Sequence, residues 1–178
     1  MNLGKIIFIN GVSSSGKSSL AKEIQRRLPE DFLHLQLDAF IGMLPRTDDD
    51  DLFMQMVDGM NRSIVAMIEA NLNVIVDHVL IVKEWMDQCL DLLGEGYVLF
   101  VGLYCELEEL ERRERKRDSR RQGFAKAQID LIHRGKIYDI ELDTKALNVG
   151  QCADLVLDYY NNQPPNAFKK MKNYSGYD

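Results

Sequence analysis

The chain has 178 residues, a length that suits one domain with a single substantial core. Lysine and arginine total 22 against 28 aspartates and glutamates, and the net charge of −6 at pH 7 argues against a nucleic-acid partner. Three widely separated cysteines without a CxxC pair argue against a disulfide framework or zinc site and favour the cytoplasm, and no apolar run approaches the ~20 residues of a membrane span.

Short apolar runs alternate along the chain with segments of helical period. In chain order the predicted elements are strand 5–10, helix 18–28, strand 32–37, helix 50–71, strand 73–76, helix 83–93, strand 97–104, helices 106–121 and 124–134, strand 138–142 and helix 149–160. This alternation favours right-handed crossovers and a parallel sheet that is covered on both faces. We therefore predict one three-layer α/β domain over 1–161 with a central five-stranded parallel sheet, and a loosely ordered tail over 162–178.

A glycine-rich segment follows the first predicted strand and matches G-x-x-x-x-G-K-[ST] at every required position. Such a P-loop directs backbone N–H groups and a helix N-terminus at phosphates. The alternative is a chance glycine-serine turn, but the position between a strand and a helix favours the nucleotide site. The predicted phosphate-binding residues are Gly11, Ser13, Ser14, Ser15, Gly16, Lys17, Ser18 and Ser19, with Lys17 on the β- and γ-phosphates and the Ser18 hydroxyl on Mg²⁺.

Two aspartates close predicted strands, Asp38 after the second and Asp77 after the third. The carboxyl ends of parallel strands share one crevice, so both side chains are expected near the P-loop. Phosphoryl transfer needs a carboxylate to take the acceptor's proton and acid near Mg²⁺, and we assign these tasks to Asp38 and Asp77 respectively. The alternative for Asp38 is a helix cap. His78 is a weaker candidate for substrate contact.

Residues 112–121 read RRERKRDSRR, and on a helix Arg113, Arg117 and Arg120 share one face. This pattern predicts a lid over about 112–124 that closes on the phosphates, with a hinge near Ser119 and Gly123. Two alternatives remain open, a solvated helix whose arginines pair with neighbouring glutamates and a small RNA-binding patch.

Five of the eight methionines lie between the second and third predicted strands, at positions 43, 54, 56, 60 and 67. Flexible thioether side chains can line an adaptable apolar pocket, although they are as often simply core. Because this region follows Asp38, we predict that it forms the acceptor side of the site.

With these residues placed, the chain resembles the chloramphenicol phosphotransferase family of P-loop kinases. The likeness covers most of residues 4–160, from FINGVSSSGKS through Asp38 and VIVDHVL to VGLYC, RRERKRDSRRQG and YDIELDT. It implies a small cytosolic kinase fold with an arginine-bearing helical lid, which moves the γ-phosphate of ATP to a primary hydroxyl of the antibiotic. It also implies Asp38 as general base, Lys17 and Ser18 as phosphate and Mg²⁺ contacts, and Arg117 and Arg120 as catalytic lid arginines. The segment between Ile41 and the methionine-rich helix is shorter than in the family, and this leaves the acceptor open.

The sequence therefore predicts an ATP- and Mg²⁺-dependent small-molecule O-phosphotransferase, with a hydroxyl acceptor for which a chloramphenicol-like compound is one candidate. The alternatives are a nucleoside or nucleotide kinase of primary metabolism and a nucleotide-binding protein without kinase turnover. Neither the acceptor nor the oligomeric state can be read from the sequence.

Overall fold

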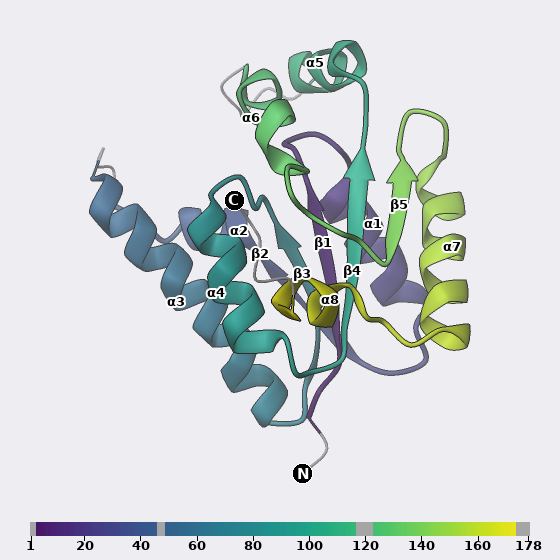
Figure 1. Ribbon diagram of the computed structural model, residues 1–178. Coiled ribbons are helices and arrows are strands. Elements are labelled where there is room, and N and C mark those ends of the chain that lie inside the picture. The colour runs from purple at the N-terminus through teal and green to yellow at the C-terminus, as the bar shows by residue number, and fades with distance from the viewer. Residues whose placement is uncertain (1–2, 46–48, 117–122, 174–178) are drawn as a thin grey trace.

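The computed structural model describes residues 3–45, 49–116 and 123–173 (Figure 1). Its centre is a five-stranded sheet in the order β2-β3-β1-β4-β5, and every pair of neighbouring strands is parallel. The strands are β1 (Ile6–Gly11), β2 (Phe32–Gln36), β3 (Asn73–His78), β4 (Val98–Tyr104) and β5 (Ile140–Asp143). The predicted α/β class and parallel sheet are confirmed.

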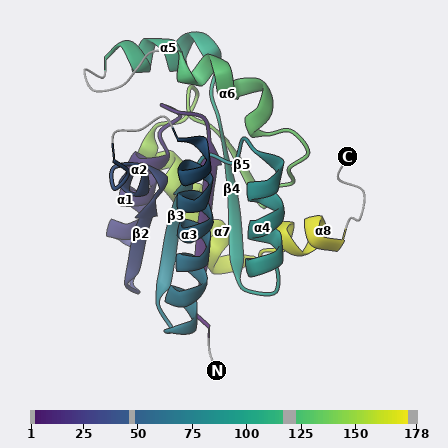
Figure 2. The same ribbon diagram turned by 90° about the vertical axis from the view of Figure 1, so that its left-hand side faces the viewer.

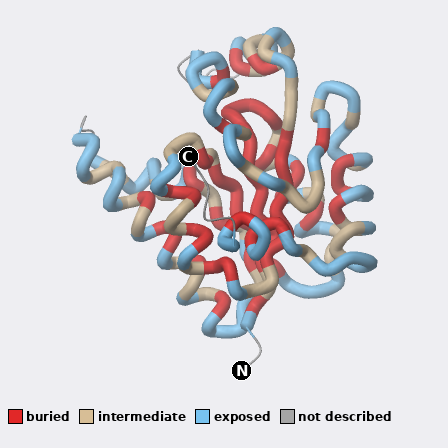
Figure 3. Tube along the Cα trace, in the orientation of Figure 1, coloured by how far each residue is buried: buried red, intermediate tan, exposed pale blue. Residues whose placement is uncertain are grey.

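Helices cover both faces of the sheet (Figures 1 and 2). One face packs against α3 (Asp50–Glu69), α4 (Lys83–Leu93) and α8 (Ala167–Asn173), and the other packs against α1 (Lys17–Arg27) and α7 (Val149–Asn162). Side chains alternate along a strand, so in β1 Ile6 and Phe8 enter the first core while Ile7 and Ile9 enter the second. Figure 3 shows the buried strands between the helices, whose outer faces are exposed.

Three short helices lie at the carboxyl ends of the strands: α2 (Leu37–Ile41), α5 (Leu107–Arg115) and α6 (Phe124–Ile132). The second strand ends at Gln36, one residue before the predicted end, because the chain turns directly into α2. The helix predicted over 106–121 is described as α5, and residues 117–122 lie outside the described part of the chain. No helix in the described ranges is long and apolar enough to span a membrane.

The prediction of a loosely ordered tail is wrong for Ala167–Asn173, which form helix α8. Asp139 caps this helix, because its Oδ1 accepts hydrogen bonds from the backbone N–H groups of Asn166 (2.7 Å) and Ala167 (3.0 Å). The Phe168 ring is buried, 5.8 Å from the ring centroid of Phe8 and 5.0 Å from that of Phe100. The sequence did not reveal this helix, because two turns are too short to show a helical period. Its cap, Asp139, is distant in sequence and meets the helix only in the folded chain.

If α8 belongs to the core, Phe168→Ala should lower the free energy of unfolding by roughly 3–5 kcal/mol, as expected for truncating a fully buried aromatic ring. Urea unfolding measures this change, with Lys169→Ala as the matched control because Lys169 lies on the same helix with an exposed side chain. Equal stability of the two variants would mean that α8 is not docked in solution.

Candidate active site

The P-loop runs from the end of β1 to the start of α1, and its backbone needs glycine at two places. Gly16 has φ 100°, in the left-handed region that favours glycine. A Cβ on Gly11 would lie 2.7 Å from Ser15 Oγ and 3.0 Å from the Leu103 carbonyl oxygen. The hydroxyl groups of Ser14 and Ser15 are buried and have no hydrogen-bond partner among the described residues. Together with the N-terminus of α1, this turn is built to receive an anion.

Asp77 lies beside the P-loop at the end of β3, as predicted. Its Oδ2 accepts a 2.5 Å hydrogen bond from Ser18 Oγ, and its Oδ1 lies 3.9 Å from Lys17 Nζ. Burial opposes ionisation, but His34 Nε2 at 3.8 Å from Oδ2, the Lys17 charge and the Ser18 hydroxyl together lower the pKa of Asp77. Asp77 is therefore a carboxylate at neutral pH. His34 was not predicted, because nothing in the spacing of β2 marks it.

A cavity of about 630 Å³ opens beside the P-loop and contains Asp38, Asp77 and Lys17 in its wall. Asp38 is in the first turn of α2 and its side chain is exposed toward this space. Most of the remaining wall is apolar and comes from α2, α3, α4, α6 and the segment after β3: Leu37, Ile41, Phe53, Val79, Ile81, Trp85 and Phe124. Ile41 and Phe124 are 39% and 46% exposed, which leaves apolar surface at the cavity.

The region between β2 and β3 contributes Ile41 and Phe53 to the cavity wall, but its methionines do not line the cavity as predicted. None of the five methionines lines this cavity: Met60 is fully buried in the core, and Met43 is 71% exposed. His78 is also outside the cavity wall, fully buried, and burial lowers its pKa to about 4. Its Nδ1 accepts the backbone N–H of Val79, so this histidine has a structural role.

A second cavity of about 460 Å³ lies on the other side of the P-loop, where Ser14, Ser15, Gly16 and Ser19 meet Arg113 and residues 144–149. Arg113 Nη2 donates to the Thr144 carbonyl oxygen at 2.6 Å, and Nη1 donates to Thr144 Oγ1 at 3.1 Å and to the Ser14 carbonyl oxygen at 3.4 Å. This arginine therefore braces the P-loop, while Arg117 and Arg120 lie outside the described residues.

The model of the family described as chloramphenicol phosphotransferase-like protein matches residues 4–161. The chain belongs to this family. A provisionally named O-phosphotransferase of Mycobacterium tuberculosis, from strains H37Rv and CDC 1551, is 30% identical over 199 residues, covering 95% of this chain and 88% of the relative. The predicted family is confirmed, and membership supports a phosphotransferase activity.

Solved structures with a similar fold include kinases and a resistance protein. The APS kinase CysC of M. tuberculosis has a TM-score of 0.70 at 18% identity, over 91% of this chain and 100% of that chain. The tunicamycin resistance protein of Deinococcus radiodurans has a TM-score of 0.68 at 20% identity, over 91% of this chain and 98% of that chain. A sugar kinase from Janibacter has a TM-score of 0.68 at 20% identity, over 89% of this chain and 95% of that chain. At these identities the likeness establishes a P-loop kinase fold and nothing about substrate.

In this family member, α5 and α6 form a hairpin that is held by Glu114. This side chain is 4% exposed, and its carboxylate accepts the backbone N–H groups of Gly123 (3.0 Å) and Ala125 (2.9 Å) at the start of α6. Within the run RRERKR a glutamate looks like a partner for surface arginines, and only the fold reveals it as a buried helix cap.

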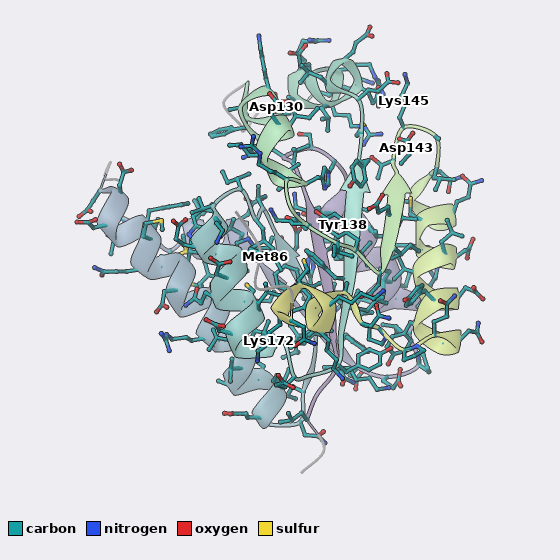
Figure 4. The ribbon with its side chains drawn as sticks, in the orientation of Figure 1. Met86, Asp130, Tyr138, Asp143, Lys145 and Lys172 are labelled. Carbon is teal, nitrogen blue, oxygen red and sulfur yellow. The ribbon has the colours of Figure 1, made fainter. Side chains whose placement is uncertain are left out.

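Asn10, at the end of β1, connects three parts of the site. Its Oδ1 accepts the backbone N–H of Leu80 (2.9 Å), so Nδ2 is the donor to the Ile132 carbonyl oxygen (3.0 Å) and to Tyr138 Oη (2.8 Å). The hydroxyl oxygen of Tyr138 (Figure 4) in turn lies 2.8 Å from Nδ1 of His133. The His133 ring stacks on the Tyr104 ring, with 3.8 Å between the ring centroids. This chain of hydrogen bonds connects the P-loop strand to the end of α6 and to the segment that follows β3.

Protonation of His133 should weaken this network. Burial lowers the pKa of His133 to about 4, so at neutral pH its Nδ1 can accept the Tyr138 hydroxyl. Between pH 6.5 and about 4 the unfolded state binds more protons, and stability therefore falls as pH falls through this window. We expect His133 to contribute about 1–2 kcal/mol to the loss of stability between pH 7 and pH 5.

The measurement is denaturant unfolding at both pH values for the wild type and His133→Phe, which keeps a ring against Tyr104 but cannot titrate. The phenylalanine variant should be less stable at pH 7, because the hydrogen bond between Tyr138 Oη and Nδ1 of residue 133 is lost, and should lose less stability on acidification. The same pH dependence in both proteins would show that His133 does not titrate in this range.

Proposed function

We propose that this protein transfers the γ-phosphoryl group of ATP to a hydroxyl group of a small, largely apolar molecule. The observation that carries the proposal is the larger cavity, which brings the P-loop, an exposed carboxylate and an apolar wall to one place. The P-loop would hold the phosphates, and the apolar wall would hold the acceptor beside them.

On the nucleotide side, Lys17 would contact the β- and γ-phosphates and the P-loop N–H groups would orient them. Ser18 and Asp77 fit a Mg²⁺ site, because they place a hydroxyl and a carboxylate oxygen 2.5 Å apart beside the loop. No cluster of three or more His, Cys, Asp or Glu in the described ranges could hold a metal alone, which suits an ion that keeps water and phosphate ligands. When bound, Mg²⁺ would neutralise charge on the phosphates.

The second cavity is the proposed site for the nucleoside part of ATP. It lies across the P-loop from the acceptor cavity, and residues 144–149 and Arg113 form its outer wall. Arg113 would then act mainly by holding the P-loop and this wall together. Arg117 and Arg120 stay predicted lid residues that would stabilise the transferring group.

On the acceptor side, Asp38 would accept the hydroxyl proton as the oxygen attacks the γ-phosphorus and the bond to the β-phosphate oxygen breaks. Asp38 suits this task because it is exposed in the cavity wall, whereas Asp77 is buried and bonded to Ser18 beside Lys17. The hairpin of α5 and α6 would exclude water.

The composition of the cavity wall favours a neutral acceptor over a nucleoside monophosphate. Within the described part of the wall, Lys17 is the only cation, and it faces the P-loop; a phosphorylated acceptor would need further positive charge.

The three cysteines are free thiols, which agrees with the cytoplasmic location that we propose for an ATP-dependent enzyme.

The test is a coupled ADP-release assay with ATP and Mg²⁺ across chloramphenicol, aromatic and aliphatic alcohols, nucleosides and nucleoside monophosphates. We expect apolar alcohols to give the highest rates above the background of ATP hydrolysis. A preference for nucleoside monophosphates would favour the nucleotide-kinase alternative. Absence of transfer to every compound, with steeply salt-dependent RNA binding, would favour a nucleotide-binding protein without kinase turnover.

A further inference from the structure

Gln128, on α6, makes a contact that none of the roles above explains. Its Oε1 accepts the backbone N–H of Ser13, in the P-loop, at 2.8 Å across 115 residues of sequence. The side chain is half-buried and lines the larger cavity together with Asp38 and Phe124. It does not line the second cavity, so it lies on the proposed acceptor side of the P-loop.

The contact with Ser13 determines which way the amide points. A backbone N–H can only donate, so the atom that faces it must be the oxygen of the carboxamide, and Nε2 lies on the other branch. Nε2 carries two N–H donors and has no hydrogen-bond partner among the residues that the structure describes. The neighbours of Gln128 in the cavity wall on the same helix, Phe124 and Ala127, offer no polar side chain.

We propose that Gln128 binds the acceptor, with Nε2 donating a hydrogen bond to one of its oxygen atoms beside the transferring phosphoryl group. This inference rests on the proposed function. Because Oε1 is hydrogen-bonded to the P-loop itself, Nε2 keeps a constant position relative to the phosphates. An acceptor that is bound by Nε2 is therefore oriented for attack. A neutral amide suits this task, since it neither repels the phosphates nor competes with Asp38 for the proton.

Two substitutions separate the two ends of the amide. Gln128→Glu keeps an oxygen for the Ser13 N–H but removes both N–H donors, and Gln128→Met removes the oxygen and the donors without adding charge. The matched control is Asp130→Asn, because Asp130 is exposed on the same helix and does not line the cavity (Figure 4).

The first measurement is amide hydrogen exchange of the peptide that contains Ser13, which does not depend on any reaction. We expect faster exchange in Gln128→Met and near-wild-type exchange in Gln128→Glu and Asp130→Asn. Wild-type exchange in Gln128→Met would show that the contact with Ser13 is absent in solution and would overturn the proposal.

The second measurement is steady-state kinetics with ATP and the best acceptor of the hydroxyl panel. Both Gln128 variants should lose roughly 10-fold to 100-fold in kcat/KM for the acceptor, with ADP affinity within about threefold of wild type. Unchanged kcat/KM in Gln128→Glu would overturn the donor role. A loss of ADP affinity as large as the loss of kcat/KM would also overturn it, because charge repulsion or damage to the P-loop would then explain both losses. If the wild type itself phosphorylates no compound, the proposed function fails, and the acceptor role fails with it even where the exchange data show the contact.

Discussion

Replacing Asp38 by asparagine is expected to lower turnover of a hydroxyl acceptor by about 10²-fold to 10⁴-fold, the usual contribution of a general base. The substitution keeps the size and one acceptor oxygen of the side chain but removes its ability to take a proton. Because Asp38 lines the proposed acceptor cavity and not the second cavity, nucleotide affinity should change little. Steady-state kinetics with the best acceptor and equilibrium binding of ADP measure the two effects separately.

Asp91→Asn is the matched control for this prediction, since Asp91 is an exposed aspartate of α4 outside both cavities. Asp38→Ala completes the set. If Asp38→Asn keeps wild-type turnover while Asp38→Ala loses it, the side chain orients the acceptor hydroxyl and does not act as a base. If both variants keep full turnover, Asp38 has no part in the reaction.

Replacing Lys17 by methionine should have the second large effect. The variant keeps the aliphatic stem and loses the ammonium that is placed to neutralise charge on the phosphates, so turnover should fall by roughly 10²-fold to 10³-fold. Nucleotide affinity should fall as well, because Lys17 is expected to contact the ground state. The pKa of Asp77 should rise in the variant, since the Lys17 charge is one of the causes that lower it.

Lys22→Met provides the control, because Lys22 is exposed on α1 and lines neither cavity. Urea unfolding of both variants checks that the fold is intact. Wild-type turnover in Lys17→Met would contradict the assignment of the P-loop as the phosphate site. A loss of affinity without a loss of turnover at saturating ATP would restrict Lys17 to ground-state binding.

Most of the nucleotide side of the site could be predicted because its residues are close in sequence. The residues from Gly11 to Ser18 are consecutive, and their spacing follows from the backbone geometry that an anion requires. Asp77 could be predicted because a parallel sheet brings strand ends together, and the structure places it 2.5 Å from Ser18 Oγ. The position of Asp38 was predicted by the same rule, and its role stays a prediction.

Most of the wall of the larger cavity, the proposed acceptor side, could not be predicted, because it is assembled from five separate parts of the chain. Trp85 and Phe53 belong to helices whose apolar residues all have the same helical spacing, and spacing does not reveal which of them face a cavity. The methionines did not identify the cavity for the same reason. A flexible side chain such as that of Met60 would suit a pocket, but the fold buries Met60 in the core.

Polar contacts between residues far apart in sequence were the other class that sequence could not reveal. Glu114 in a charged run, Gln128 on a short helix and Asp139 at the start of a strand all read as surface residues. Each instead bonds to backbone N–H groups that are brought to it by the tertiary fold.

By itself the sequence determined the fold class, the family and the phosphate cradle, because strand and helix periodicity and the P-loop are local patterns that few neighbouring residues can specify. Only the tertiary structure decided the shape and apolar lining of the larger cavity, the docking of α8 and the contact of Gln128 with Ser13. These features depend on which side chains meet across the molecule, and no local pattern carries that information.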